Sequence, residues 1–470
     1  MTDIIDQPMA TPRPRLTVVG TGYLGATHAV SMASLGYEVL GVDVDQAKID
    51  RLTRGEVPFH EPGLPEMLDE ALASGNLRFT TSFDEAAEFG DVHFVCVGTP
   101  QLHGSHAANL AYVEAAFTAI AQRVRKSTLI VGKSTVPVGT AERLADMVAA
   151  AAPDPDLVEV AWNPEFLREG YAVQDTLHPD RLVFGVSSER AETSLRAAFE
   201  PVLEAGTPLV VADMKTAELV KVAANSFLAT KISYINAMAE ICEVTGADVN
   251  LLASALSYDD RIGARFLKPG LGFGGGCLPK DIRAFMHRAE ELGVGHAVEF
   301  LHEVDEINAR RRRRTVDLVR ELAGGDLRGM RIACLGAAFK PNSDDIRDAP
   351  ALDVADMLRA QAADVVVYDP EAMGNAREAY PQLDYAPTFA ECVKGADVVV
   401  LLTEWARFRE ADPEMMGELV RHRAMVDGRH ALDADAYRSA GWEYRALGRP
   451  AQPQTVRLVE DVKDQVAAMA

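Results

Sequence analysis

The 470-residue chain has little of what marks a disulfide-rich or membrane-spanning protein. Its five cysteines are far apart and odd in number, and none belongs to a CxxC pattern or a histidine cluster, which argues against a disulfide framework and a zinc site. Apolar runs stay shorter than a membrane span. Residues 1–14 contain prolines and lack the apolar core of a signal peptide. We therefore expect a cytoplasmic protein without a metal site.

Positive charge is also scarce. The 47 Lys and Arg residues are outnumbered by 70 Asp and Glu residues, which gives a formal charge of −23. Such a surface repels nucleic acid and anionic membranes, so we expect neither as a partner. An anionic small substrate would have to be met by local cations. The apolar fraction of 48% is ordinary for a globular protein, and the length predicts two or three domains.

Strand and helix patterns alternate in the first part of the chain. Residues 15–20 form a short β-branched run, residues 26–35 a helical pattern that Gly36 ends, and residues 38–43 a second strand. Further strands are expected at residues 92–97, 129–133, 158–161 and 182–186. This alternation predicts a doubly wound parallel sheet of the Rossmann type over residues 15–212.

The middle of the chain differs. Residues 213–245 contain no Gly or Pro, and their apolar side chains recur at helical spacing until Gly246. Helices are also expected at residues 281–292 and 297–322. The pattern predicts a central all-helical domain over residues 213–325, built on a long spine helix.

Strand and helix patterns return after Met330. Residues 331–336, 364–369 and 396–402 parallel three strands of the first domain in character, which predicts a second Rossmann-like domain over residues 326–450. This copy lacks a glycine fingerprint, so it need not bind a dinucleotide. Residues 1–14 and 451–470 are expected to be tails.

A glycine motif, Gly20-Thr-Gly22-Tyr-Leu-Gly25, follows the first strand and opens a helix, and Asp43 ends the next strand 18 residues after Gly25. Glycines permit a tight turn and a close approach to a pyrophosphate, which the helix N-terminus attracts. The Asp43 carboxylate suits a ribose diol and repels a 2′-phosphate, so NAD is favoured over NADP. The alternative is a Rossmann-like domain with another ligand or none.

Two strand-end segments accompany this motif. Gly98-Thr99-Pro100 and the segment from Lys133 to Pro137, which includes Thr135, follow strands at the edge where such sheets bind ligands. They are either plain turns or walls of the cofactor pocket, and we favour the second interpretation.

A second glycine-rich segment carries the strongest chemical signal. Five glycines fall between Gly270 and Gly276 and end at Cys277. So many glycines suggest that the backbone lies close to a ligand. Pro279 suits the first turn of a helix, which would place Cys277 at its positive end near Lys280, and both effects favour a thiolate. Asp281 lies one helical turn further on, where it could relay protons. The other four cysteines are interpreted as buried small hydrophobes.

Three charged clusters are ambiguous from the pattern alone. Glu165 and Glu169 would share one face if helical, but could equally be solvated acids of a first helical turn. Lys221 and Asn225 share a face of the long helix and could be ordinary surface. The run Arg310–Arg314 is expected to be a solvated helix face.

Together these motifs resemble the UDP-glucose/GDP-mannose dehydrogenase family, and most closely its members that oxidise UDP-glucose. The resemblance extends from Arg15 to about Leu447, and its most specific part is the segment Arg261–Lys268 that runs into the Cys277 loop. Residues 163–170 and 339–347 add to it. The resemblance implies that one carbon of UDP-glucose is oxidised twice by NAD, through a thiohemiacetal and a thioester on Cys277, to give UDP-glucuronate. GDP-mannose or a UDP-N-acetylhexosamine stays open as the substrate.

The resemblance also implies roles for individual residues. Cys277 is the nucleophile, Lys221 and Asn225 stabilise an oxyanion, Asp281 handles protons, and Glu165 with Thr135 positions or activates water. The implied cofactor-binding residues are Gly20, Gly22, Tyr23, Leu24, Gly25, Asp43, Lys48, Gly98, Thr99, Pro100, Thr135, Glu169, Lys280 and Arg347. The implied substrate-binding residues are Glu165, Phe166, Leu167, Arg168, Glu169, Lys221, Asn225, Arg261, Phe266, Lys268, Gly270, Phe273, Gly274, Phe339, Lys340 and Arg429. A homodimer or larger homo-oligomer is implied, with Arg261 reaching across the interface.

Two other hypotheses differ in kind. A simpler hydroxyacid dehydrogenase would have a Rossmann domain and a helical spine with a catalytic lysine, but would need neither Cys277 nor a third domain. A non-catalytic sensor of nucleotide sugars would have no use for a reactive thiol, so Cys277, Lys221 and Asp281 argue against it.

Overall fold

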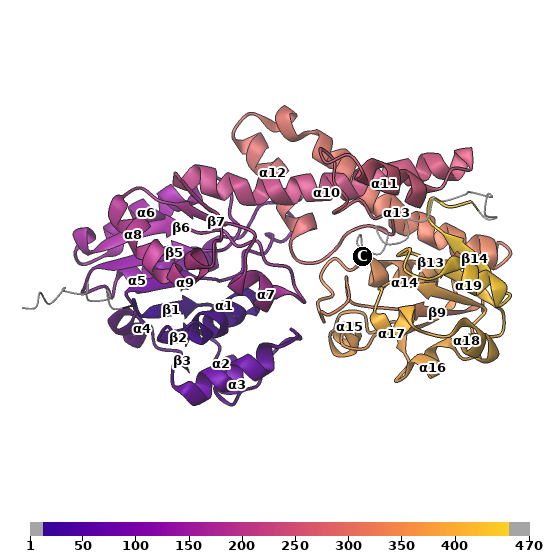
Figure 1. The fold of residues 1–470 in the computed structure, drawn as a ribbon, viewed down its shortest axis with the longest axis horizontal. Helices are drawn as coiled ribbons and strands as arrows, with labels where there is room; N and C mark the ends of the chain where they lie inside the picture. Colours follow the sequence, from indigo (N-terminus) through magenta and orange to yellow (C-terminus); the bar gives the residue numbers. More distant parts are fainter. Residues whose placement is uncertain (1–12, 451–470) are drawn as a thin grey trace, which may run out of the picture. The chain divides into compact units, whose positions relative to one another are not determined.

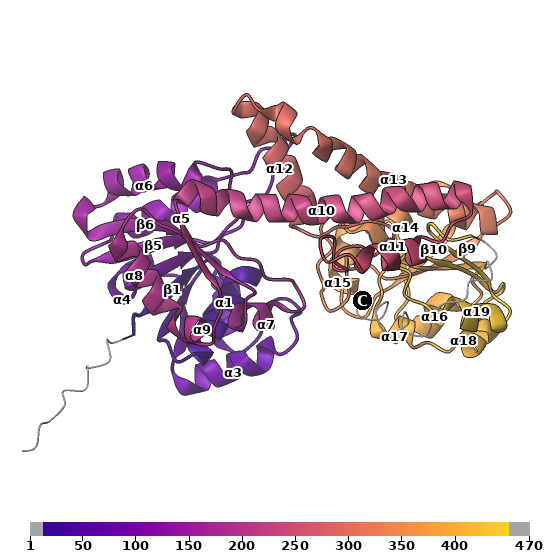
Figure 2. The same ribbon diagram turned by 45° about the horizontal axis from the view of Figure 1, so that its top comes forward.

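The computed structural model describes residues 13–450, so the predicted tails fall outside the described residues except for Arg13 and Pro14 (Figure 1). The chain forms two compact units, one that ends at Lys221 and one that begins at Val222. This boundary lies inside helix α10 (Met214–Thr245), which is one continuous helix (Figure 2). No helix in residues 13–450 has the length and apolar content needed to cross a membrane.

The first unit is built on an eight-stranded sheet of order β3-β2-β1-β4-β5-β6-β7-β8. Its strands are β1 (Leu16–Val19), β2 (Val39–Val42), β3 (Leu77–Thr80), β4 (Val92–Val95), β5 (Thr128–Gly132), β6 (Val158–Trp162), β7 (Leu182–Gly185) and β8 (Leu209–Ala212). Strands β1, β2 and β4 are buried along their whole length, as expected for a sheet covered on both faces.

Helices cover both faces of this sheet, which confirms the doubly wound prediction. They are α1 (Tyr23–Ser34), α2 (Gln46–Thr53), α3 (Leu64–Ser74), α4 (Phe83–Phe89), α5 (Ala111–Ala121), α6 (Thr140–Ala151), α7 (Ala172–Leu177), α8 (Glu189–Ala198) and α9 (Glu200–Glu204). One apolar core joins the sheet to α1, α3 and α8, and a second core on the other face joins it to α4, α5 and α6.

One junction of the sheet differs from the expected parallel pattern. Strands β6 and β7 pair antiparallel, through Trp162 and Gly185. An antiparallel neighbour needs no crossover over the sheet face. The connection from β6 to β7, which contains residues 163–170, therefore stays at the edge where the parallel strands end.

The second unit begins with helices. After α10 come α11 (Val249–Ser257), α12 (Leu278–Glu291) and α13 (Phe300–Leu322). The long helix predicted over residues 213–245 is confirmed, and Gly246 follows it with a positive φ of 77°. Within this unit α10 contacts α13 through a hydrogen bond of 2.7 Å, which the Ser233 hydroxyl donates to the carbonyl of Val304.

A six-stranded parallel sheet of order β11-β10-β9-β12-β13-β14 completes the second unit. Its strands are β9 (Arg331–Leu335), β10 (Asp364–Tyr368), β11 (Asp384–Tyr385), β12 (Val398–Leu401), β13 (Ala424–Asp427) and β14 (Glu443–Ala446), and its helices are α14 (Pro350–Ala360), α15 (Met373–Ala379), α16 (Phe389–Val393), α17 (Ala406–Arg409), α18 (Pro413–Leu419) and α19 (Ala434–Ser439). Strand β9 lies between β10 and β12 just as β1 lies between β2 and β4, which confirms the second Rossmann-like fold.

The run Arg310–Arg314 on α13 is not a solvated face, so that expectation was wrong. Arg311 is fully buried and donates to Glu243 of α10 over 3.0 Å, and Arg312 is 8% exposed and pairs with Asp348 over 2.9 Å. Arg313 is the most exposed residue of the run, with 54% of its side chain exposed, against 35% for Arg310 and 30% for Arg314. The two buried guanidinium groups pair with acidic residues far along the chain, and a local pattern cannot reveal such partners.

We expect the two neighbouring arginines to respond differently to substitution. Arg311→Met leaves Glu243 without one of its buried partners, and breaking such a pair costs about 3 kcal/mol, or a Tm lower by about 6 °C. Arg313→Met removes only an exposed pair and should shift Tm by less than about 1 °C. Differential scanning calorimetry of both variants checks this. Equal shifts would contradict the burial of Arg311.

Candidate active site

The glycine turn after β1 has the geometry that a dinucleotide requires. Gly20 has φ of 88°, and a Cβ on Gly25 would lie 1.8 Å from the carbonyl oxygen of Gly20, so neither position tolerates a side chain. A Cβ on Gly22, by contrast, would meet no atom within 4 Å. Helix α1 begins directly after Gly22, which has no side-chain cap. The free helix N-terminus and the open space above Gly22 therefore fit a pyrophosphate.

Asp43, at the end of β2, is 7% exposed and lies against this turn. Its Oδ2 accepts hydrogen bonds from the Thr21 amide at 2.8 Å and from Lys48 Nζ at 2.8 Å. Burial alone would raise the pKa of Asp43, but these donors hold the pKa below its usual value. The carboxylate is therefore ionised at neutral pH, as discrimination against a 2′-phosphate requires.

The two predicted wall segments are hydrogen-bonded to each other. The Thr99 hydroxyl donates to the carbonyl of Thr135 over 2.8 Å, and the Ser134 hydroxyl donates to the carbonyl of Val97 over 2.5 Å. Both segments follow strands β4 and β5 at the carboxyl edge of the sheet. They form one connected wall at the edge that carries the glycine turn.

Lys133, the first residue of the second wall segment, is a buried cation to which the sequence pattern gave no role of its own. It is 6% exposed, and its Nζ donates to Asn163 Oδ1 over 2.7 Å. The ammonium also lies over the rings of Phe94 and Phe199, at 5.7 and 5.5 Å from their centres. Burial lowers the pKa of Lys133. The sequence indicated this burial only through the buried apolar strand β5, which Lys133 directly follows.

Residues 163–168 form an irregular loop, so the helical arrangement considered for Glu165 and Glu169 was wrong. Glu165 accepts a hydrogen bond from the Leu167 amide at 2.7 Å and pairs with Lys221 at 3.2 Å. The side chains of Lys221 and Glu165 are only 6% and 14% exposed. The structure thus brings these two predicted residues together as a nearly buried ion pair.

Phe166 and Arg168, which follow Glu165 and are also predicted to bind substrate, contact different neighbours. Phe166 stacks under Arg181, with 3.9 Å from the guanidinium carbon to the ring centre, and Lys221 lies 5.5 Å from the same centre. Arg168 instead points away to Asp175, with which it makes an ion pair at 2.7 Å and 58% exposure of its side chain. Glu169 is 9% exposed.

Cys277 lies in the second unit, at the N-cap position of α12, and Pro279 follows it within the first turn. Its side chain is exposed, whereas the other four cysteines are buried, as expected. The Asp281 amide donates to the carbonyl of Cys277 over 2.9 Å, which confirms that one helical turn separates the two residues. An exposed thiol at the positive end of a 14-residue helix is a suitable nucleophile.

Asp281 itself is 1% exposed and fully engaged. Its two carboxylate oxygens accept hydrogen bonds from Asn225 Nδ2 and from Lys280 Nζ, each over 2.7 Å. Asn225 comes from α10, one helical turn beyond Lys221. Asn225, Asp281 and Cys277 are therefore connected within the second unit, whereas Glu165 and Lys221 form their pair in the first.

The glycines before Cys277 make room for neighbouring segments of the chain. A Cβ on Gly272 would lie 2.2 Å from Asn308 Oδ1, and one on Gly275 would lie 2.8 Å from the Phe339 ring. Asn308 is buried and bonds both the amide and the carbonyl of Phe273. These contacts come from distant segments, so the glycine spacing alone could not distinguish them from a ligand.

Several predicted substrate residues lie around this loop. Phe339 packs on Gly275, Lys340 Nζ lies 5.2 Å from the centre of the Phe339 ring, and the Arg347 guanidinium packs on Gly276. Arg429 donates to the carbonyls of Leu402, Gly272 and Phe339 over 2.7 to 3.0 Å. Its guanidinium is thus already used to hold the loop.

Other predicted substrate residues lie outside this group. Arg261 has an 88% exposed side chain and pairs with its neighbour Asp259 over 2.6 Å. Phe266 is 37% exposed with a positive φ of 65°. Gly270 accepts no side chain either, because a Cβ would lie 2.9 Å from the carbonyl oxygen of Gly428. Lys268 is half-buried two residues before Gly270.

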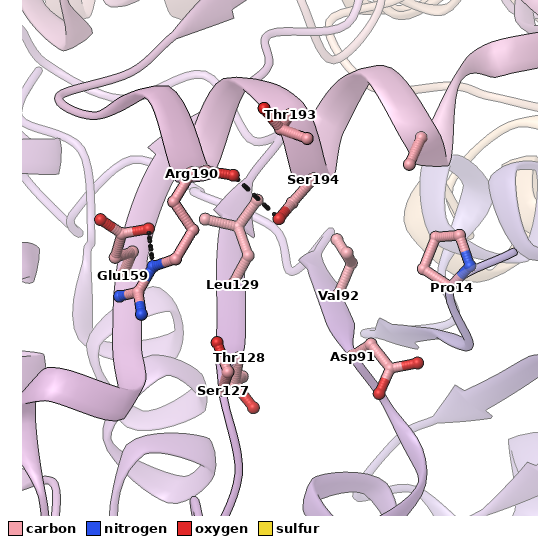
Figure 3. A pocket seen from close by; sticks show the side chains of 11 residues that line it. Pro14, Asp91, Val92, Ser127, Thr128, Leu129, Glu159, Arg190, Thr193 and Ser194 are labelled. Carbon is pink, nitrogen blue, oxygen red and sulfur yellow. Dashed lines mark hydrogen bonds and ion pairs between the residues drawn. The ribbon is translucent and has the colours of Figure 1, made fainter. Parts of the chain in front are cut away.

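A shallow pocket in the first unit lies at the opposite edge of its sheet (Figure 3). It is lined by the starts of β4 and β5, including Asp91 and Thr128, and by α8, where Arg190 pairs with Glu159 over 2.7 Å. None of the predicted cofactor or substrate residues lines it.

The comparisons with known proteins agree over nearly the whole chain. Three parts of the UDP-glucose/GDP-mannose dehydrogenase family match: its NAD binding domain over residues 14–203, its central domain over 215–310 and its UDP binding domain over 333–434. The chain is 40% identical to UDP-glucose 6-dehydrogenase YwqF of Bacillus subtilis, over 93% of this chain and 98% of that protein.

Two solved structures are similar to the chain. A UDP-glucose dehydrogenase from the archaeon Pyrobaculum islandicum is 38% identical with a TM-score of 0.86, covering 94% of this chain and 99% of that one. A UDP-D-ManNAc dehydrogenase from Pyrococcus horikoshii is 27% identical with a TM-score of 0.80, covering 93% and 100%.

Two alanine substitutions should separate cofactor binding from folding in the glycine turn. Gly22→Ala keeps the fold, because φ of −71° suits any residue and the new Cβ meets open space, but NAD affinity should fall by about tenfold or more. Gly25→Ala forces a clash between backbone atoms and should lower Tm strongly. Calorimetry and NAD titration measure the two effects. A Gly22→Ala protein that binds NAD as tightly as the wild type would contradict this assignment.

Proposed function

The chain belongs to the UDP-glucose/GDP-mannose dehydrogenase family, and we propose that it oxidises the C6 hydroxyl of UDP-glucose to a carboxylate, giving UDP-glucuronate. The observation that carries this proposal is the exposed Cys277 thiol at the start of α12, next to the buried Asp281–Asn225 pair. The relative from Bacillus subtilis, named a UDP-glucose 6-dehydrogenase, supports the choice of sugar.

The Gly20–Gly25 turn would hold NAD, which would supply the hydride acceptor for each of two successive oxidations. The first oxidation turns the alcohol into an aldehyde and releases a proton. Charge develops on the C6 oxygen in this step. The Lys221 ammonium and the Asn225 amide, one helical turn apart on α10, are the donors that stabilise it.

The aldehyde is then captured by Cys277. Its sulfur forms a bond to C6, and the aldehyde oxygen takes a proton to give a thiohemiacetal. An aldehyde has no hydroxyl from which the second oxidation can proceed, whereas the thiohemiacetal has one. Loss of the second hydride and of the hydroxyl proton leaves a thioester.

Water completes the reaction. The water oxygen bonds to C6, the C–S bond breaks, and the thiol is restored with a proton. Glu165, supported by Thr135, activates this water, and Asp281 carries protons to and from the sulfur and C6 oxygen. In total one UDP-glucose, two NAD and one water give one UDP-glucuronate, two NADH and three protons.

Local cations meet the anionic substrate on a protein whose formal charge is −23. We assign Lys268, Lys340 and Arg429 to the sugar diphosphate, with Phe266, Phe273 and Phe339 as apolar contacts. Lys48, Glu169, Lys280 and Arg347 border the cofactor. Because Arg429 already donates to three carbonyls, it contributes its charge to the substrate while it holds the loop.

We also propose that two copies pair through α10. Phe227, Tyr234 and Ile241 recur every seven residues on this helix and are 66%, 51% and 52% exposed, and Val244 beyond them is 86% exposed. An apolar stripe with this spacing is typical of a helix that packs on another helix. Residues 213–325 would then form the dimerisation domain, and the exposed Arg261 would be free to reach the partner copy.

The number of NADH formed per sugar tests the chemistry. The wild type should yield two NADH per UDP-glucose consumed, and Cys277→Ser should lower turnover by roughly 10³-fold or more, because a serine hydroxyl is a far weaker nucleophile. Cys392→Ala, at a buried cysteine of the second sheet, is the matched control and should keep the yield of two.

A yield of one NADH per sugar, or an unchanged turnover in Cys277→Ser, would contradict the thioester route and indicate a simple alcohol dehydrogenase. A yield of two with GDP-mannose or a UDP-N-acetylhexosamine, but not with UDP-glucose, would keep the mechanism and change the substrate. The similarity to a UDP-D-ManNAc dehydrogenase makes that second substrate class worth including.

Sedimentation velocity tests the dimer. Phe227→Glu places a charge at the first position of the stripe and should shift the protein to monomers at micromolar concentration. Tyr112→Glu alters an equally exposed aromatic residue on α5, 58% exposed, and should leave the assembly unchanged. A Phe227→Glu protein that sediments like the wild type would rule out this stripe as the interface.

A further inference from the structure

Glu61 is a buried carboxylate to which the mechanism above gives no role. It lies in the loop between α2 and α3 and is 2% exposed, although glutamate is among the residues least often buried. A buried carboxylate is tolerated only where donors converge on it. The groups that donate hydrogen bonds to Glu61 therefore identify the segments that it connects.

Those donors come from two segments of the proposed active site. The Gly170 amide donates to Glu61 Oε2 over 2.7 Å, and the Ala172 amide donates to Oε1 over 2.7 Å. The Tyr23 hydroxyl also donates to Oε2 and in turn accepts from the Gly170 amide over 2.9 Å. Glu61 thus joins the glycine turn, through Tyr23, to the end of the loop that carries Glu165 and Glu169.

The surroundings of Tyr23 keep this link in place. Its ring packs on Phe59 with 4.7 Å between ring centres. Burial, and then the neighbouring Glu61 carboxylate, raise the pKa of Tyr23, so the hydroxyl keeps its proton and remains a donor at physiological pH.

The other end of the same loop is also tied to the sheet. The Asn163 side chain accepts a hydrogen bond from Lys133 Nζ over 2.7 Å and donates one to the carbonyl of Val183 over 3.0 Å. The backbone amide of Asn163 donates to the carbonyl of Gly132 over 2.8 Å. Residues 163–168 between these anchors form neither helix nor strand. The position of Glu165 therefore depends on the two ends of the loop and on its pair with Lys221.

We propose that Glu61 is a positioning residue for catalysis: by binding the amides of Gly170 and Ala172 together with Tyr23, it fixes the Glu165–Glu169 loop relative to the cofactor turn. This inference rests on the proposed function of Glu165 in activating water. A carboxylate is required because amide and hydroxyl donors meet both of its oxygens. A glutamine would have to turn an NH₂ group toward one of them.

The proposal predicts which step slows when Glu61 is replaced. A loop displaced by about 1 Å can cost up to about 100-fold in rate. Both hydride transfers depend on the cofactor turn, and the second also depends on Cys277, whereas hydrolysis depends on Glu165. Glu61→Gln should therefore lower kcat by about 10- to 100-fold, while the KM for NAD stays within about threefold of the wild type.

Pre-steady-state kinetics separates this effect from a loss of folded protein. With excess NAD and UDP-glucose, Glu61→Gln should release a burst of two NADH per active site, followed by a steady phase that is slower than in the wild type. A variant that merely contains less folded enzyme would lower the burst and the steady rate in proportion. That proportional loss would overturn the proposal.

Asp91→Asn is the matched control. Asp91 also accepts a backbone amide, that of Arg15 at 2.9 Å, and pairs with Lys126 at 2.6 Å, but it lies at the opposite edge of the same sheet (Figure 3). Its loss should lower Tm without changing the burst or kcat by more than about twofold.

Three further outcomes are decisive. A Glu61→Gln enzyme with kcat within twofold of the wild type would overturn the positioning role, as would an Asp91→Asn enzyme with the same kinetic defect. If the wild type itself yields only one NADH per sugar, the proposed function fails instead. A smaller loss for Tyr23→Phe than for Glu61→Gln is expected, because Tyr23→Phe leaves both amide bonds intact.

Discussion

A charge that leaves water must be paired or hydrogen-bonded, and this constraint orders the loops at the carboxyl edges of both sheets. In the first sheet, Asp43 collects donors from Thr21 and Lys48. In the second, Asp369 stands at the same place after β10 and accepts from the amides of Ala337 and Ala338 and from the Trp405 indole. Each carboxylate thus accepts backbone hydrogen bonds from the turn after the first strand of its sheet, β1 or β9, and fixes the conformation of that turn.

The difference between the two carboxylates explains why one fold serves two purposes. Beside Asp43 the glycine turn leaves open space at Gly22 and a free helix N-terminus. The Trp405 indole donates a hydrogen bond to the Asp369 carboxylate. Ala337 and Ala338 stand in this turn where Thr21 and Gly22 stand in the first. The second domain keeps the Rossmann topology but not the dinucleotide cradle, in agreement with its match to a UDP binding domain.

The same constraint governs the reactive groups. Asp281 and Lys221 are almost fully buried, and each has a partner that holds its charge: Lys280 for Asp281 and Glu165 for Lys221. Cys277 alone is exposed at the end of a helix. In the mechanism that we propose, Asp281 and Asn225 are held by hydrogen bonds within the second unit while Cys277 stays accessible, so little free energy is lost to reorganisation of these polar groups.

Local pattern predicted much of this architecture. Short β-branched runs located most of the strands and the repeat of the Rossmann fold, and period-3.6 spacing located α10, because those signals depend on neighbours in the chain; strands β3, β8, β11, β13 and β14 were not predicted. Burial of Arg311, the contacts of the Cys277 loop and the antiparallel β6–β7 junction depend on segments that are distant in the chain, such as Glu243 for Arg311 and Arg429 for Gly272, so spacing could not reveal them. Glu61 has no local sequence signature for the same reason, since the amides of Gly170 and Ala172 that donate to it lie more than a hundred residues further along.

The most direct test of the thioester account is the mass of the enzyme during turnover. In Glu165→Gln the two oxidations can proceed, but water is no longer activated, so the acyl group should remain on the protein. Acid-quenched samples mixed with NAD and UDP-glucose should then gain the mass of one UDP-glucuronyl group, located by peptide mapping on Cys277. An unmodified Cys277, or an adduct on any other residue, would contradict the account.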